Sequence, residues 1–104
     1  MIKAIISGAA GRMGRSLIGA VQTSDEFSLV GALESENSEL LGLDAGELAG
    51  VGKAGVLLST TDESLVEQAD VMIDFSSPLA SVFHAETCAE LGTALVIGTT
   101  GMDS

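Results

Sequence analysis

The sequence is poor in aromatic residues and in cysteine. Its 104 residues include three phenylalanines but no tryptophan or tyrosine, so its core must be built from aliphatic side chains. The single cysteine, Cys88, excludes an intrachain disulfide and a cysteine-based zinc cluster. Because Cys88 lies within a helical pattern, we expect it to be a small core residue rather than a nucleophile.

Long hydrophobic runs are missing as well. No apolar run approaches the roughly 20 residues that a membrane-spanning helix needs, and the apolar residues after Met1 are too few for the core of a signal peptide. We therefore expect a cytoplasmic protein without a membrane partner.

Basic residues are few. Four lysines and arginines stand against 15 acidic residues, which gives a net charge of −11 and argues against nucleic acid and anionic membranes as partners. Two of the four, Arg12 and Arg15, flank a glycine-rich segment and can make the local field positive there, which favours a phosphate ligand. The alternative, that both are only solvated residues of a first helical turn, stays open.

Glycine, in contrast, is abundant, and three glycines have a regular spacing. Gly8, Gly11 and Gly14 follow a short apolar run at residues 4–6 and lead into apolar residues at helical spacing. Such a strand, turn and helix lets a phosphate approach the backbone at the positive end of the helix, so a pyrophosphate is the expected occupant. The spacing is Gly-x-x-Gly-x-x-Gly rather than Gly-x-Gly-x-x-Gly, and a glycine-rich turn without a ligand stays open as the alternative.

Glu34 is the second candidate binding residue. It ends an apolar run at residues 27–33 and lies 20 residues after Gly14, where a carboxylate could accept both ribose hydroxyls of an adenosine. The alternative is a solvated residue at the end of a strand.

In the middle of the chain, the apolar residues follow neither helical nor strand spacing for long. Residues 35–55 are rich in Gly, Ser and acidic residues, and we expect a long mobile loop with one helical turn near residues 38–41. A short strand follows at residues 56–58. Thr60 and Glu63 have the spacing of a capping box, which predicts a brief helix through Gln68.

The last third of the chain has clear boundaries. We expect strands at residues 71–75 and 93–98, joined by a helix that has Ser77 as N-cap, Pro78 at its first position and Gly92 at its end. His84, the only histidine, lies in this helix. No partner and no cleft for it are visible in the sequence, so we expect a surface or packing residue rather than a general acid.

Five segments together resemble dihydrodipicolinate reductase, and the resemblance runs the length of the chain. They are the glycine segment 8–14, residues 32–34, the Leu-Asp-Ala-Gly-Glu-Leu-Ala-Gly segment 43–50, the Asp-Phe-Ser-Ser-Pro segment 74–78 and the Val-Ile-Gly-Thr-Thr-Gly segment 96–101. The resemblance implies an oxidoreductase that uses a nicotinamide cofactor to reduce 4-hydroxy-tetrahydrodipicolinate on the diaminopimelate route to lysine.

The resemblance also implies a fold and a set of binding residues. We expect an α/β fold, a Rossmann-like doubly wound parallel sheet, truncated, with helices on both faces, as one dinucleotide-binding domain over residues 1–104. Because such sheets bind ligands at the carboxyl ends of their strands, the binding residues should gather at one edge. The expected cofactor-binding residues are Gly8, Ala9, Ala10, Gly11, Arg12, Met13, Glu34, Phe75, Ser76, Gly98, Thr99 and Thr100, with Thr100 also near the substrate, and we expect no catalytic residue and no metal site.

Ser35 bears on the choice of cofactor. Family members that accept the 2′-phosphorylated cofactor resemble one another in carrying arginine directly after this glutamate, whereas this chain has Ser35 followed by Glu36. We therefore expect NAD(H) to be preferred, with NADP(H) as the alternative.

The family's substrate-binding histidines, their lysine and the sheet that forms its homotetramer lie in a second domain, which this sequence does not contain. We therefore expect the cofactor domain alone, which binds the dinucleotide without turnover and self-associates through residues 93–98, while the small-molecule substrate binds only to the full-length enzyme. Two alternatives stay open: a stand-alone dinucleotide-binding or redox-sensing module, and a glycine-rich interaction domain without a ligand.

Overall fold

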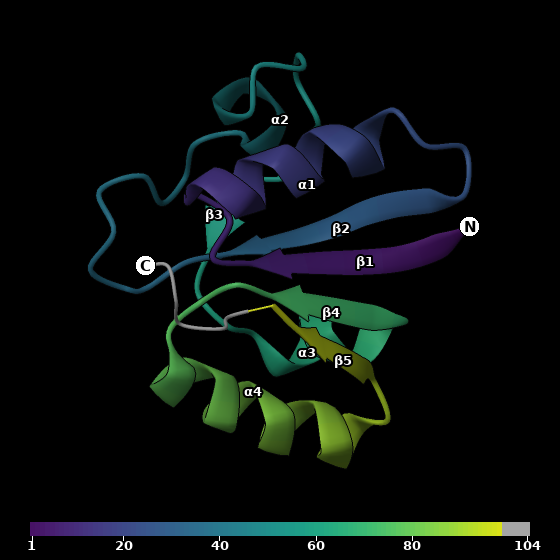
Figure 1. Cartoon of the computed structure of the whole chain (residues 1–104), viewed down its shortest axis with the longest axis vertical. Coiled ribbons are helices and arrows are strands. Elements are labelled where there is room, and N and C mark those ends of the chain that lie inside the picture. The colour runs from purple at the N-terminus through teal and green to yellow at the C-terminus, as the bar shows by residue number, and fades with distance from the viewer. Residues whose placement is uncertain (99–104) are drawn as a thin grey trace.

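The computed structural model of the chain describes residues 1–98. Five strands form one parallel sheet (Figure 1), in the order β3-β2-β1-β4-β5. The strands are β1 (Ile2–Ser7), β2 (Phe27–Leu33), β3 (Leu58–Ser59), β4 (Val71–Asp74) and β5 (Ala94–Ile97). The order turns outward in both directions from β1, as in a doubly wound Rossmann-like sheet, so the predicted fold class is confirmed.

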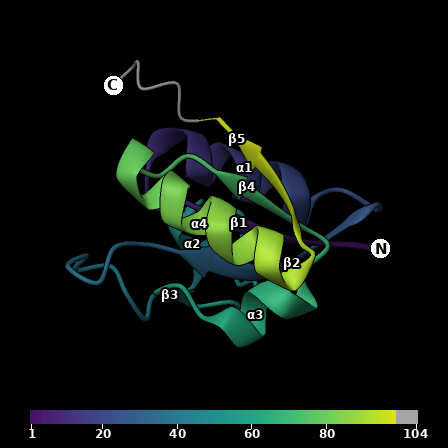
Figure 2. The same cartoon turned by 90° about the horizontal axis from the view of Figure 1, so that it is seen from below.

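Helices cover both faces of this sheet (Figures 1 and 2). On one face lie α1 (Arg12–Gln22) and α2 (Ala45–Leu48), and on the other lie α3 (Glu63–Gln68) and α4 (Pro78–Leu91). Neighbouring residues of β1 point to opposite faces: Ile6 packs in the cluster that contains Ile18 of α1, and Ile5 packs in the cluster that contains Val66 of α3. The core is therefore aliphatic and split by the sheet, as the composition predicts.

The boundaries of α4 agree with the sequence. The Ser77 hydroxyl accepts a hydrogen bond from the N–H of Ala80, Pro78 occupies the first turn, and Gly92 ends the helix at a φ of 76°. A left-handed φ of this kind favours glycine, which explains why the helix stops there. The buried position of Cys88 on α4 also confirms its predicted place in the core, where burial, followed by the charge of Asp74, raises the pKa of the thiol.

The prediction for residues 35–55 is wrong about where the helical turn lies. Residues 39–42 form a turn, and the short helix is α2, which begins after Asp44. The Asp44 carboxylate accepts hydrogen bonds from the backbone N–H groups of Gly46, Glu47, Ala54 and Gly55, at 2.8 to 3.1 Å. These bonds, the one from Ala54 foremost, outweigh desolvation and hold the pKa of Asp44 below its usual value of 3.8. A single carboxylate thus organises this connection, whose mobility stays a prediction.

The predicted capping box before α3 is also wrong. Asp62, not Thr60, is the N-cap, and its carboxylate accepts a hydrogen bond of 3.0 Å from the N–H of Ser64. The helix ends at Gln68 as predicted. Within residues 1–98, no helix combines the length and the apolar character that crossing a membrane would require.

Candidate functional site

The glycine turn joins β1 to α1 and is tied to the end of β2. The N–H groups of Gly8 and Ala9 both donate to the carbonyl oxygen of Leu33, at 3.0 and 3.1 Å. Gly8 has a φ of 77°, and a Cβ there would lie 2.7 Å from the backbone carbonyl of Phe75. A Cβ on Gly14 would collide with the carbonyl oxygen of Gly8. Packing alone therefore explains why these two positions are glycine.

Gly11 is different, because neither its backbone nor its packing requires glycine. Its φ of −76° and ψ of 172° suit any residue. A Cβ built on it would have a single neighbour within 4 Å, the Gly8 carbonyl oxygen at 3.4 Å. Gly11 is also the N-cap of α1, where it offers no side-chain hydrogen bond to the helix. Because Gly11 has no side chain, a ligand can approach the first turn of α1 there.

No acidic side chain offsets the positive end of the helix dipole in the first turn of α1. The side chains of Arg12 and Met13 in this turn are exposed. Arg15 donates from Nε to the carbonyl oxygen of Ala10 at 2.8 Å, which holds the guanidinium beside the turn. The helix dipole and two arginines thus act on the same place, an arrangement suited to an anion.

Glu34 reaches this turn from the end of β2. Its Oε2 accepts a hydrogen bond of 2.8 Å from the N–H of Ala10, and its Oε1 accepts a longer one, 3.3 Å, from the N–H of Ser35. The alternative of a merely solvated residue at a strand end is therefore wrong, since the carboxylate is fixed to the turn.

A pocket of ≈ 640 Å³ opens beside the turn, at the carboxyl ends of β1 to β4. Its volume lies within the range of small-molecule sites. It brings together Gly8, Glu34 and Ser76, as expected for three motifs at one sheet edge. Among residues 1–98, the lining consists of Ser7, Gly8, Leu33, Glu34, Ser35, Glu36, Thr60, Thr61, Ser76, Ser77, Ala80, Phe83 and His84.

Seven other predicted residues that the structure describes do not line this pocket: Ala9, Ala10, Gly11, Arg12, Met13, Phe75 and Gly98. The side chain of Ala9 is buried in the core, and its N–H is engaged by Leu33. A Cβ on Gly98 would overlap the ring of Phe75, so these two residues pack directly on each other beside β5. The predicted residues Thr99 and Thr100 lie outside the described residues.

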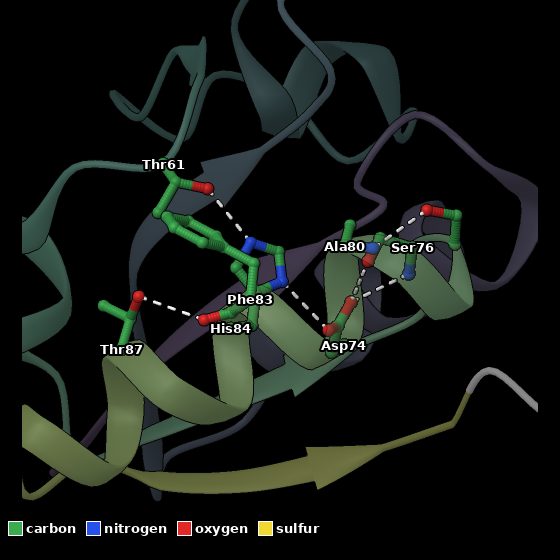
Figure 3. A network of polar contacts seen from close by, with 8 residues as sticks. Thr61, Asp74, Ser76, Ala80, Phe83, His84 and Thr87 are labelled. Atoms are coloured by element: carbon green, nitrogen blue, oxygen red, sulfur yellow. Dashed lines mark hydrogen bonds and ion pairs between the residues drawn. The ribbon is translucent and has the colours of Figure 1, made fainter.

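Three residues of the pocket lining, Thr61, Ser76 and His84, take part in one polar network (Figure 3). Nδ1 of His84 is 2.9 Å from Oδ2 of Asp74, and its Nε2 is 3.0 Å from Oγ1 of Thr61. Oδ1 of Asp74 accepts hydrogen bonds from both the N–H and the hydroxyl of Ser76. Burial alone would raise the pKa of Asp74, but the hydrogen bonds from His84 and Ser76 outweigh it and lower the pKa to about 2. The network joins β4, α4 and the segment after β3.

Sequence reasoning missed this network. The prediction that His84 is a packing residue is confirmed by its burial, but the expectation that it has neither partner nor cleft is wrong. One signal was available: Asp74 ends a strand ten residues before His84, and such a strand and the following helix pack together. Thr61, 23 residues before His84, carries no comparable signal.

Comparison with known proteins agrees with this architecture. Residues 2–104 match the family described as dihydrodipicolinate reductase, N-terminus. The chain is similar to the dipicolinate-bound dihydrodipicolinate reductase of Paenisporosarcina sp. TG-14, with 26% identity and a TM-score of 0.73 over 97% of this chain and 38% of that one. It is similar also to the amine dehydrogenase of Mycobacterium smegmatis, with 26% identity and a TM-score of 0.73 over 92% of this chain and 29% of that one.

A third structure shares the fold at lower identity. Aspartate semialdehyde dehydrogenase from Candida albicans, solved with NADP, has 18% identity and a TM-score of 0.73 over 97% of this chain and 30% of that one. The chain thus spans 29% to 38% of the length of these three proteins. Because the family match runs over nearly the whole chain and the fold agrees with it, the chain belongs to the dihydrodipicolinate reductase family, in the region of its amino-terminal domain.

Proposed function

We propose that this chain binds NADH at the glycine turn, as the cofactor-binding part of a reductase. The observation that carries the proposal is Gly11. Gly8 and Gly14 are needed for packing, whereas Gly11 lacks a side chain at a place where the fold has room for one. A ligand that must approach the first turn of α1 closely gives a reason for that glycine.

The residues around the turn fit a dinucleotide. Arg12 and Met13 in the first turn would hold the pyrophosphate at the positive end of α1. Gly8, Ala9, Ala10 and Gly11 would line its approach, since their own N–H groups donate to oxygens of Leu33, Glu34 and Gly8. Glu34 would bind the ribose with Oε1, the oxygen that its bond to Ala10 leaves less engaged. We assign the nicotinamide end to a second group of residues: Phe75, Ser76, Gly98, Thr99 and Thr100.

Membership of the family supports a reaction for the complete protein. When bound, the nicotinamide ring supplies a hydride, and the chain's own task is to bind and orient the cofactor at the carboxyl ends of the strands. We propose that the complete protein is cytoplasmic and reduces 4-hydroxy-tetrahydrodipicolinate to tetrahydrodipicolinate in lysine biosynthesis. In this proposal the complete enzyme is a homotetramer, Thr100 lies near its substrate, and residues 1–104 alone have no turnover.

The first experiment is Gly11→Val. The branched side chain should block the approach to the turn and weaken NADH binding by at least about tenfold, or about 1.4 kcal/mol, as calorimetry measures it. Gly19→Ala is the matched control on the same helix, because a Cβ there has only an ordinary contact, 3.5 Å from Val51. Both variants should stay folded in urea titrations: Gly19→Ala should be about 0.5–1 kcal/mol more stable because alanine favours a helix interior, and Gly11→Val should be slightly less stable because valine is a poor N-cap. A parent that gives no heat with millimolar NADH, or a Gly11→Val variant that binds as the parent does, would contradict the proposal.

We also propose that NADH is preferred over NADPH. Ser35 and Glu36 line the pocket beside Glu34, so a 2′-phosphate would face two carboxylates. A like-charge contact of this kind costs on the order of 1 kcal/mol when partly exposed, so NADH should bind several-fold more tightly. Ser35→Arg should strengthen NADPH binding and so bring the two dissociation constants closer together. Ser35→Ala, the neutral control, should leave their ratio unchanged. Equal dissociation constants for both cofactors at low salt would refute the preference.

A further inference from the structure

Part of the pocket lining comes from elements other than the glycine turn and β2, and we call it the far part. That far part is lined by Thr60 and Thr61, which follow β3, and by Ala80, Phe83 and His84 of α4. The inference drawn here rests on the proposed function. With the phosphates at the turn and the ribose at Glu34, the next group of an adenosine is its base, which therefore belongs in this far part.

The hydrogen bonds of His84 determine whether the Thr61 hydroxyl, which lines this far part of the pocket, can donate a hydrogen bond to a ligand or only accept one. Asp74 is fully buried, and its Oδ1 is engaged by the N–H and the hydroxyl of Ser76. An ionised carboxylate can only accept, so Nδ1 of His84 must donate its hydrogen to Oδ2 of Asp74. In a neutral imidazole this leaves a lone pair on Nε2.

The lone pair of Nε2 determines which way the Thr61 hydroxyl points. The two atoms are 3.0 Å apart, so with a neutral imidazole the hydroxyl donates its single hydrogen to His84. Only the lone pairs of the Thr61 oxygen remain to meet a ligand. The chain from Asp74 through His84 thus turns a hydroxyl, normally both donor and acceptor, into an acceptor.

We propose that Thr61, held in this orientation by His84, recognises the 6-amino group of adenine and discriminates against purines that carry a 6-oxo group. The amino group of adenine is a donor, whereas the 6-oxo group is an acceptor and would oppose the Thr61 oxygen. Phe83, whose side chain is half exposed beside the pocket, offers a surface on which either purine can stack. Stacking supplies affinity here, and Thr61 supplies the choice of base.

The test compares NADH with reduced nicotinamide hypoxanthine dinucleotide, in which a 6-oxo group and an N1–H replace the 6-amino group and the N1 lone pair of adenine. The parent should bind the hypoxanthine analogue about three- to tenfold more weakly, the effect of one hydrogen bond in a partly exposed site. Thr61→Val should bring the ratio of the two dissociation constants close to one by weakening NADH. Thr61→Ser should keep the parent's ratio. Thr60→Val, the neighbouring control, should also keep it, and Phe83→Ala should weaken both ligands equally.

The outcomes separate this inference from the proposed function. If both dinucleotides bind the parent equally well, the proposed function stands and the role of Thr61 is overturned. A ratio that survives in a folded Thr61→Val variant overturns it as well. If neither dinucleotide binds, the proposed function fails and this inference fails with it. If Thr61→Val does not fold, Thr61→Ala, which also lacks the hydroxyl, takes its place with the same expected ratio.

Discussion

The two longest helices, α1 and α4, lie on opposite faces of the sheet and follow opposite rules. α1 buries its apolar residues Ile18 and Val21 and exposes polar ones. α4 buries Ser81, His84, Thr87 and Cys88, while Leu79, Val82 and Phe83 are 84%, 60% and 52% exposed. Helical burial of apolar residues is the ordinary source of stability. We therefore expect α1 to stabilise the hydrophobic core, and the buried polar residues of α4 to have a further role.

The buried face of α4 shows what else it serves. His84 and Asp74 are joined by a buried hydrogen bond of 2.9 Å between Nδ1 and Oδ2, and His84 also lines the pocket. Departures from the hydrophobic pattern are expected where a chain serves function rather than packing. The polar face of α4 is thus a structural sign of the site, independent of the glycine turn on the α1 side.

The largest difference between the helices should appear in truncations. Ile18→Ala removes a fully buried side chain of α1 and should lower the free energy of unfolding by about 2–5 kcal/mol. Val82→Ala removes an exposed side chain of α4 and should change it by no more than about 0.5 kcal/mol. Urea denaturation of both variants measures the contrast, and similar losses would mean that the outer face of α4 is packed in solution.

A smaller effect is expected at the polar core of α4. Asp74→Asn leaves the Nδ1–H of His84 facing an amide in place of a carboxylate, and should cost about 1–3 kcal/mol near neutral pH. The pKa of Asp74 in the folded chain, about 2, lies below its usual 3.8. Its stabilisation is therefore complete above about pH 4 and is lost as the pH falls through about 2.

The pH dependence provides the control for that variant. Asp44 also has a lowered pKa, so the parent should lose stability in acid through more than one group. The difference between parent and Asp74→Asn isolates Asp74, and it should shrink between about pH 4 and pH 2. Asp70→Asn, at an exposed carboxylate that accepts the N–H of Lys3, should show a smaller difference near neutral pH. If the difference in the free energy of unfolding between parent and Asp74→Asn does not change with pH, the lowered pKa of Asp74 is contradicted.

The features that could be predicted from the sequence depend on local signals. The turn at Gly8, the strand over residues 27–33 and the two ends of α4 are specified by residues that are neighbours in the chain. The gathering of Gly8, Glu34 and Ser76 at one edge follows from the parallel sheet that these signals imply. For this reason, that half of the candidate site was within reach of sequence reasoning.

The rest depends on distant contacts. Asp44 bonds to N–H groups ten and eleven residues away, and Thr61 bonds to His84 across 23 residues. Before α3, Thr60 and Asp62 were both possible N-caps by sequence, and in the folded chain Asp62 caps the helix. Buried polar groups of this kind leave no periodic pattern, since they are satisfied by partners that only the folded chain brings near.

The smallest expected effect on stability concerns two exposed apolar surfaces on the α4 side. One is the outer face of α4, and the other is β5, which pairs only with β4 among residues 1–98 and has Val96 and Ile97 half exposed. β5 carries no charged residue of the kind that protects edge strands, so we expect self-association through β5 rather than α4. Val96→Lys should make the chain sediment as a monomer at high micromolar concentration, while Val82→Lys should leave its association unchanged, and both should alter stability by no more than about 0.5 kcal/mol. A parent that is already monomeric would refute the association, and a monomeric Val82→Lys would move the interface to α4.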